Sequence, residues 1–198
     1  MKKLILASQS QRRRQLLEEA GLAYTLLIRD TDESYPATLK CEEIARYVAE
    51  RKAEAFGEND IPDDTVLITA DTIVWLPGKG NGRAGEGTAL FKPKDEDDAI
   101  AMLGKLSGRM HTVATGVCLR SKAKRKVFHV LTNVFFKPLS LEERSYYVKN
   151  FEPYDKSGSY GIQEWIGVIG IERIEGSYTN VMGLPIKELY EELVAWKE

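Results

Sequence analysis

At 198 residues, the chain is long enough for one large domain or for two small lobes that share a cleft, and two independent domains are not expected. Hydrophobic residues make up 43% and charged residues 29%, which is typical of a globular protein and excludes disorder along the whole chain. The formal net charge of −2 gives no overall basic field that would draw the chain onto nucleic acid.

The first half of the sequence alternates between strand and helix patterns. Residues 3–7 predict a short buried strand, residues 11–20 a helix closed by Gly21, and residues 22–28 a second extended segment. This order indicates an α/β unit. An amphipathic helix is predicted over residues 41–56, and the apolar run of residues 65–70 predicts a strand that ends at Asp71.

Five glycines interrupt residues 77–87, and their spacing matches neither a dinucleotide fingerprint nor a P-loop, so we expect a flexible surface insertion there. The rest of the chain predicts further helices and strands. These are a helix over 95–106, a hairpin of residues 112–119 and 126–136, a helix over 141–149, a loop over 151–161, an extended segment over 167–174 and a closing helix over 186–197.

Cys41 and Cys118 are far apart and form no CxxC pair, so we expect neither a disulfide framework nor a zinc site. No apolar run reaches 18 residues, and the N-terminal apolar run stops at Ser8. We therefore expect a cytoplasmic protein without a membrane segment.

The segment from Ser8 to Arg14 holds two serines and three arginines between the first strand and the first helix. Unpaired amides at a helix start, together with hydroxyls and guanidiniums, suit the binding of a triphosphate. The alternative is structural: a serine that caps the helix, followed by a solvated basic turn.

Asp71 follows the buried strand of residues 65–70, where ligand crevices open in α/β sheets, and it could hold a hard cation or orient water. An Asx-turn that ends the strand is the alternative. Asp32 and Glu33 lie in a polar loop, and because Mg²⁺ usually takes one or two carboxylates, Glu33 with Asp71 would suffice. Taken alone, an acidic loop of this kind is usually a solvated surface.

Lys52, Lys92 and Lys156 lie beside these motifs and could act as point cations toward a triphosphate, although each alone resembles a surface lysine. Residues 158–185 are rich in Gly, Tyr, Gln and Asn, which would allow close backbone approach to a ligand and recognition of a base edge. A plain turn-rich connection is the alternative. His111 and His129 form no triad or metal pair and are interpreted as structural.

In chain order, the motifs LASQSQRR from Leu6, Asp32-Glu33, Ala70-Asp71-Thr72, Lys92-Pro93, LSGRMH from Leu106, DKSGSYGIQ from Asp155 and GSYTNVMGLP from Gly176 span nearly the whole chain. Together they resemble the Maf-like nucleotide pyrophosphatases. The resemblance implies one domain over residues 1–198 with an α/β fold: two lobes around an elongated mixed sheet with a central substrate cleft, similar to inosine-triphosphate pyrophosphatases. It also implies a homodimer.

The resemblance further implies roles for individual residues. Asp71 would be the general base, with Glu33 as an acidic or metal-linked partner, and the two would hold a divalent metal, Mg²⁺ or Mn²⁺. Lys52, Lys92, Ser8, Ser10 and Arg13 would surround the phosphates. Arg13, Thr72 and Gln163 are similar to the branch of the family that acts on pyrimidine nucleotides, and an amide such as Gln163 can present both a donor and an acceptor to the base.

The implied activity is hydrolysis of dTTP and UTP, or of modified pyrimidine triphosphates, to the monophosphate and pyrophosphate. Three features depart from the family pattern: Gln11 replaces a proline, the glycine-rich stretch before Lys92 is longer, and Ser157 and Ser159 replace alanines. The alternatives are a non-catalytic nucleic-acid or cell-division protein and a pyrophosphatase for inosine or xanthosine triphosphate. We expect a nucleoside triphosphate as the partner, with no stable nucleic-acid or membrane partner.

Overall fold

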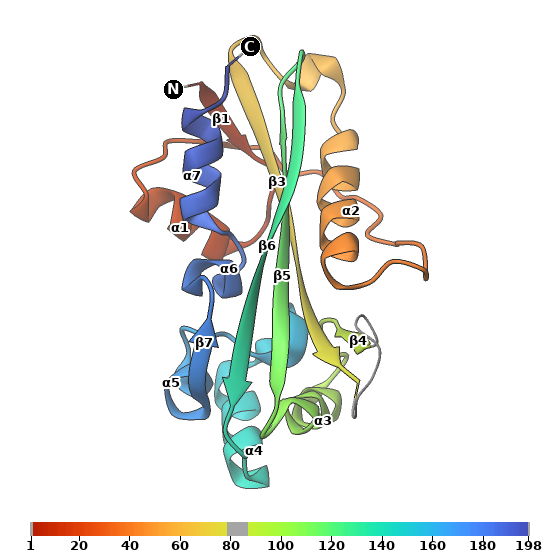
Figure 1. Ribbon diagram of the computed structural model, residues 1–198, viewed down its shortest axis with the longest axis vertical. Helices are drawn as coiled ribbons and strands as arrows, with labels where there is room; N and C mark the ends of the chain where they lie inside the picture. Colours follow the sequence, from red (N-terminus) through yellow and green to blue (C-terminus); the bar gives the residue numbers. More distant parts are fainter. Residues whose placement is uncertain (1, 79–86, 198) are drawn as a thin grey trace.

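The computed structural model describes residues 2–78 and 87–197, which include one mixed seven-stranded sheet (Figure 1). The strand order is β2-β1-β3-β5-β6-β7, and β4 also pairs with β3. The strands are β1 Lys3–Leu6, β2 Thr25–Leu26, β3 Thr65–Pro77, β4 Gly87–Leu90, β5 Met110–Arg120, β6 Arg125–Phe136 and β7 Ile171–Glu175. β1 pairs parallel with β2 and β3, and the other pairings are antiparallel, which confirms the predicted mixed α/β fold.

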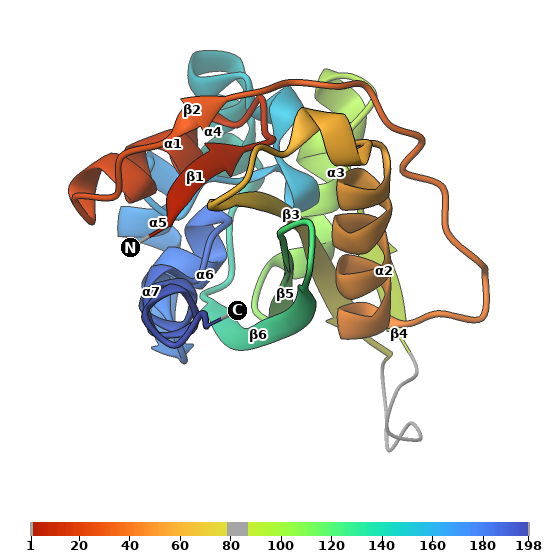
Figure 2. The ribbon, with the colours of Figure 1, turned by 90° about the horizontal axis from the view of Figure 1, so that it is seen from above.

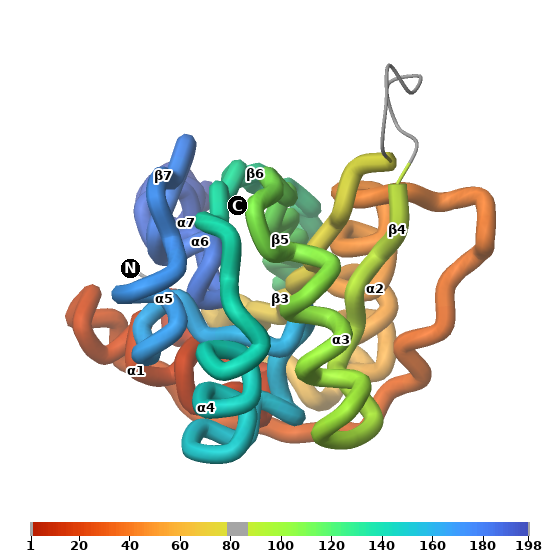
Figure 3. Tube along the Cα trace, turned by 90° about the horizontal axis from the view of Figure 1, so that it is seen from below, coloured from red at the N-terminus to blue at the C-terminus, as the bar shows by residue number. Residues whose placement is uncertain are grey.

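The helices cover both faces and one end of this sheet. They are α1 Gln11–Glu19, α2 Cys41–Glu54, α3 Glu96–Leu106, α4 Leu141–Phe151, α5 Trp165–Gly170, α6 Tyr178–Met182 and α7 Ile186–Val194, with short 3₁₀ helices η1 Glu58–Asp60, η2 Pro153–Asp155 and η3 Ser157–Ser159. Seen from above, α2 lies on one side of the long strands, and α1, α6 and α7 lie on the other (Figure 2). α3, α4 and α5 gather at the end opposite the two termini (Figures 1 and 3).

The three long strands β3, β5 and β6 run along the molecule and connect its two ends (Figure 1). One core cluster includes Leu4 and Leu17 near the termini as well as Leu103 and Tyr147 at the far end. Two smaller clusters fill the space between α2 and the sheet. Apolar burial is therefore continuous from one lobe to the other.

The prediction that the strand of residues 65–70 ends at Asp71 was wrong. β3 continues to Pro77, and its pairing with β5 is unbroken from Leu67 to Trp75. The strand continues because Ile73 to Leu76 are buried apolar residues that pack in the core. The Asx-turn alternative for Asp71 is wrong for the same reason.

The other edge of β3 is interrupted, and this interruption places the site. β1 pairs with β3 only up to Ile68, whereas β4 pairs with it only from Val74. Between them, the carbonyls of Ala70 and Thr72 accept hydrogen bonds from the side chains of Arg13 and Ser157 at 2.8 and 3.1 Å. Side chains of the middle of β3 can therefore reach open space.

Several other predictions can be compared with the structure. The structure confirms five predicted elements with small shifts of their ends: the helices that became α1, α2, α3 and α4, and the hairpin of β5 and β6. The extended segment over 22–28 contains only the two-residue β2, and the segment over 167–174 begins with helix α5. Of the glycine-rich insertion, residues 79–86 lie outside the described residues. Within the described ranges, no helix is both long and apolar enough to cross a membrane.

Candidate active site

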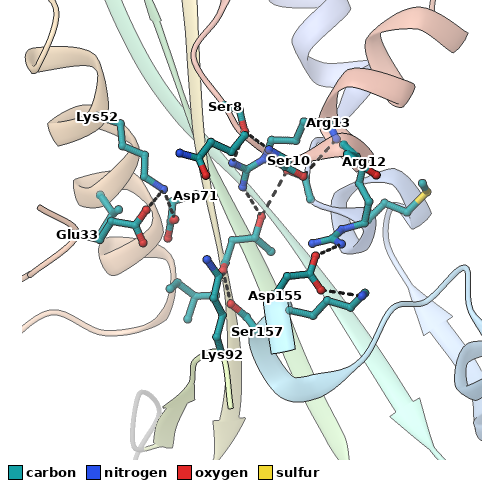
Figure 4. A pocket seen from close by; sticks show the side chains of 18 of the residues that line it. Ser8, Ser10, Arg12, Arg13, Glu33, Lys52, Asp71, Lys92, Asp155 and Ser157 are labelled. Carbon is teal, nitrogen blue, oxygen red and sulfur yellow. Dashed lines mark hydrogen bonds and ion pairs between the residues drawn. The ribbon is translucent and has the colours of Figure 1, made fainter. Parts of the chain in front are cut away.

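A pocket of about 1320 Å³ opens at the interrupted edge of β3. All nine residues predicted for the site line it: Ser8, Ser10, Arg13, Glu33, Lys52, Asp71, Thr72, Lys92 and Gln163. They come from α1, α2, β3 and the segments between elements, and Figure 4 shows most of them around one space. The structure therefore brings together residues that are up to 155 positions apart, from Ser8 to Gln163.

Lys52 joins the two candidate acidic residues. Its Nζ lies 2.8 Å from Asp71 Oδ1 and 2.8 Å from Glu33 Oε1 (Figure 4). Lys52 comes from α2, Asp71 from β3 and Glu33 from the loop before α2. Because α2 packs directly on β3, the ammonium reaches the carboxylate across a short gap.

Burial raises the pKa of Asp71, and this effect outweighs the opposing influence of the Lys52 ammonium and of Arg13. Burial acts in the same direction on Glu33, but the Lys52 hydrogen bond and charge, with Lys92 and Arg13, hold the pKa of Glu33 below its usual range. Asp71 and Glu33, which both pair with Lys52, thus differ in basicity. A raised pKa suits a general base that works near neutral pH.

Asp71 and Thr72 point to opposite faces of the sheet because neighbouring strand residues alternate. Asp71 faces α2, on the same side as Thr69, whose hydroxyl donates to Ala49 O at 2.6 Å. Thr72 faces α6: its Oγ1 lies 3.0 Å from Thr115 Oγ1 and accepts from Arg13 Nη2 at 3.2 Å. The pocket reaches both faces because the edge of β3 is open there.

The buried side chain of Arg13 forms hydrogen bonds with β3, with the residue after α6 and with the segment before α1. It donates to Ala70 O and Gly183 O at 2.8 Å each, and to Ser8 Oγ at 3.3 Å. Burial lowers the pKa of this guanidinium, and Asp71 partly offsets that effect. Among the described residues it has no carboxylate partner within ion-pair distance, so its charge is not cancelled by direct pairing.

The segment Ser8 to Arg13 combines both interpretations drawn from the sequence. Ser10 is the N-cap of α1, and its Oγ accepts from Arg13 N at 3.4 Å. Ser8 Oγ accepts from Ser10 N at 3.2 Å. Both serines nevertheless line the pocket beside the start of α1, where the helix dipole favours anions.

Lys92, between β4 and α3, and Gln163, between η3 and α5, also line the pocket. Both are exposed, and among the described residues neither forms a hydrogen bond or an ion pair. Gln163 also lines a second, smaller pocket with Ile174 and Tyr178. The two side chains are therefore available to a ligand.

Sequence reasoning missed part of the wall beside Gln163. Arg12 Nη1 lies 2.8 Å from Asp155 Oδ2, and Lys156 Nζ lies 2.7 Å from Asp155 Oδ1 and 3.1 Å from Glu164 Oε1. Lys156 was a candidate cation, but Asp155 and Glu164 were not singled out. Asp155 begins the motif that ends at Gln163 and Glu164 directly follows it, and these positions were the available signal.

Glu33 and Asp71 are the candidate metal ligands of the pocket. No group of three or more His, Cys, Asp or Glu within residues 2–78 and 87–197 is arranged to hold a metal. Glu33 and Asp71 are brought together by the same ammonium, so the chain offers two carboxylates. Mg²⁺ commonly takes one or two carboxylates and completes its shell with water and substrate phosphates, so these residues suit it.

Neither histidine belongs to the site. His111 is buried, and its Nε2 shares a hydrogen bond of 2.7 Å with Tyr160 Oη, whereas His129 is exposed on β6. Cys41 and Cys118 are buried free thiols. Their burial raises the pKa of both thiols, which makes them poor nucleophiles.

The fold and pocket define an α/β protein with a buried carboxylate, a paired lysine and two cations that form no ion pair within the described part of the chain. This arrangement is suited to hydrolysis of a small phosphorylated ligand. The family model described as Maf-like protein matches residues 3–196. The chain belongs to the Maf family.

Several curated relatives cover nearly the whole chain. A dTTP/UTP pyrophosphatase of Phocaeicola vulgatus is 50% identical over 192 residues, which are 96% of this chain and 94% of that protein. A protein of the same name from Flavobacterium psychrophilum is 46% identical over 95% of this chain and 91% of its own. Among solved structures, a HAM1 protein from Coxiella burnetii has a TM-score of 0.49 at 12% identity, covering 99% of this chain and 100% of that one.

Proposed function

We propose that the chain hydrolyses dTTP and UTP to the nucleoside monophosphate and pyrophosphate. The observation that carries this proposal is the pairing of Asp71 with Lys52 in a pocket that Arg13 and Lys92 also line. It is supported by 50% sequence identity to a protein named dTTP/UTP pyrophosphatase. An α/β pocket with this balance of charge suits a triphosphate better than a neutral ligand.

In this proposal, Asp71 takes a proton from a water molecule whose oxygen attacks the α-phosphorus. The new P–O bond forms as the bond to the bridging oxygen breaks, and pyrophosphate leaves with that electron pair. Among the described residues, the Asp71 carboxylate is hydrogen-bonded only through Oδ1, to Lys52, so Oδ2 is available for the proton. Lys52 orients the carboxylate by that bond.

Arg13 and Lys92 would stabilise the negative charge that develops on the phosphate oxygens, together with Ser8 and Ser10 at the start of α1. Glu33 and Asp71 would hold the divalent cation, Mg²⁺ or Mn²⁺. Such an ion neutralises phosphate charge when it is bound.

Thr72, Gln163 and Arg13 form the proposed base-recognition set. Gln163 is supported by its exposure and by the absence of any described partner for its amide, which leaves a donor and an acceptor for the base edge. Thr72 lines the same pocket, and its hydroxyl is held by hydrogen bonds with Arg13 and Thr115.

A nucleotide panel tests the proposal. Purified protein with Mg²⁺ is given canonical and modified triphosphates, including inosine and xanthosine triphosphate, in ¹⁸O-labelled water. We expect the fastest pyrophosphate release from dTTP and UTP, with the label in the monophosphate. Preference for the purines would support the alternative pyrophosphatase, and no turnover with salt-sensitive binding of nucleic acid would support the binding-protein alternative.

We also propose a cytoplasmic homodimer. The buried free thiols of Cys41 and Cys118 are consistent with a reducing compartment. Light scattering of the purified chain measures the oligomeric state, and a mass near 22.3 kDa at micromolar concentration would contradict the dimer.

A further inference from the structure

Two lysines in the pocket share an unusual environment. Lys52 lies between Glu33 and Asp71, and Lys156 lies between Asp155 and Glu164. Both ammonium-bearing side chains are largely buried, with 15% and 10% of their surface exposed. The first group is the proposed catalytic centre, whereas the second has no role in the proposed mechanism.

The second group, which we call the neutral wall, consists of Arg12, Asp155, Lys156 and Glu164. Two cations face two carboxylates in it, and each of its ion pairs is between 2.7 and 3.1 Å long. The wall therefore offers an anion little net attraction. Arg13 and Lys92, by contrast, have no carboxylate partner among the described residues.

Glu164 is the most firmly held carboxylate of the neutral wall. Its side chain is 19% exposed, against 61% for Asp155. The Tyr147 hydroxyl from α4 bonds its Oε2, and the Gly161 amide donates to that same hydroxyl at 3.0 Å. A Cβ at Gly161 would lie 2.7 Å from the carboxyl carbon of Glu164, so a side chain there would displace this carboxylate.

The neutral wall adjoins the proposed base-recognition residue, because Gln163 directly precedes Glu164. A triphosphate in this pocket can bind to any cation that lacks a carboxylate partner. If Lys156 or Arg12 carried an unneutralised charge, it would attract the phosphates to the neutral wall, and the α-phosphorus would then lie away from Asp71.

We propose that Glu164 is a positioning residue for the nucleotide: by neutralising Lys156, it keeps the triphosphate from binding along the neutral wall and leaves that wall to the nucleoside. This inference rests on the proposed function. Asp155 acts in the same way on Arg12 and Lys156, from a more exposed position.

The inference predicts a specific kinetic signature. If the freed cation binds triphosphate in a reversed, unproductive orientation, kcat and KM for UTP fall by the same factor, and kcat/KM is unchanged because free enzyme and transition state are unaffected. Loss of a direct substrate contact would instead raise KM or lower kcat/KM.

The experiment compares Glu164→Gln and Asp155→Asn with the wild-type protein. We expect kcat and KM for UTP to fall together by about three- to tenfold, with kcat/KM held within about twofold. Calorimetric titration with inorganic tripolyphosphate should show binding that is tighter by a similar factor. Adding Lys156→Met to Glu164→Gln removes the freed cation and should restore the wild-type tripolyphosphate affinity.

Asp63→Asn is the matched control, because Asp63 pairs with Lys122 at 2.8 Å and lines neither pocket. It removes the same charge and should change neither kinetic constant. Unchanged tripolyphosphate affinity in both pocket variants, or a fall in kcat/KM, would overturn the inference. Failure of the wild-type protein to release pyrophosphate would instead overturn the proposed function, and the tripolyphosphate titrations would still test the charge balance of the wall.

If Glu164→Gln does not fold, as judged by circular dichroism, Asp155→Asn decides the question. The Asp155 side chain is 61% exposed, so its substitution removes a charge at little cost in packing.

Discussion

The chemistry of this pocket depends on how a few charged side chains are paired. Asp71 lies within a strand, where an ionised carboxylate is costly unless it is compensated, and Lys52 supplies the compensation at 2.8 Å. Glu33 and Lys52 complete the group. The surrounding cations Arg13 and Lys92 keep their charge for a ligand.

Gln163 provides a test of base recognition at the scale of one residue. Because its amide is exposed and the phosphate ligands lie elsewhere in the pocket, Gln163→Ala should reduce the preference for dTTP and UTP over other triphosphates by about tenfold. Turnover of a less favoured nucleotide should change much less. An unaltered ratio of kcat/KM values across the nucleotide panel would contradict the role.

His111 gives a prediction about pH and stability. Burial lowers its pKa to about 3, from 6.5 for an ordinary histidine. Between pH 6.5 and about pH 3, the histidine is protonated in the unfolded chain but neutral in the folded chain. The free energy of unfolding therefore falls as the pH decreases through this range, by up to about 1.4 kcal/mol per pH unit. Above 6.5, this contribution is fully present.

Urea unfolding at several pH values between 7 and 4 measures this effect. His111→Gln should lose stability at pH 7 but show a shallower decline with acid than the wild-type protein. Parallel curves for the wild type and His111→Gln would show that His111 does not contribute to acid sensitivity.

At the scale of elements, α2 controls the position of Lys52, and Gly116 controls the approach of α2. Gly116 is the β5 partner of Asp71, and a Cβ there would overlap the backbone of α2 at Ala45. Gly116→Ala should therefore destabilise the fold by about 1–3 kcal/mol and reduce turnover by moving Lys52 away from Asp71.

Gly57→Ala is the control for this prediction. Its added Cβ would meet only Asp60 Oδ2, at 3.6 Å, which is ordinary contact. Denaturant unfolding and UTP turnover should then be close to wild type. If Gly116→Ala matches this control in both measurements, the close packing of α2 does not set the geometry of the site.

Elements with a local signal could be predicted from the sequence. The N-cap serine of α1 and the apolar periodicity of α2 are signals that lie within a few residues of each helix, and both helices were predicted. The continuation of β3 beyond Asp71 could not be predicted, because it depends on pairing with residues 112–115 of β5, which lie 37 to 43 positions later. The apolar run of α5 was ambiguous, since short apolar segments do not distinguish helix from strand.

The site shows the same division. Motifs at Ser8, Asp71 and Gln163 identified the pocket residues, and the structure places all of them around one cavity. The ion pair between Arg12 and Asp155 joins residues 143 positions apart, and only the tertiary fold brings them together. Sequence thus indicated the residue types of the site but not which charges cancel one another.

At the scale of the whole molecule, β3, β5 and β6 extend through both lobes, and one core cluster includes residues from each. We therefore propose that residues 1–198 form a single domain that unfolds in one cooperative transition. Calorimetry should give equal calorimetric and van't Hoff enthalpies. Two resolved transitions would show that the lobes are separate folding units.

The whole molecule positions one carboxylate in a cationic pocket, and Asp71→Asn tests that arrangement most directly. The substitution preserves size, and Lys52 keeps Glu33 as its partner. Pyrophosphate release from UTP should fall by about 10²-fold or more while the unfolding midpoint stays near that of the wild type, since a general base contributes about 10²–10⁴-fold. Near-normal release by a folded Asp71→Asn protein would contradict the account.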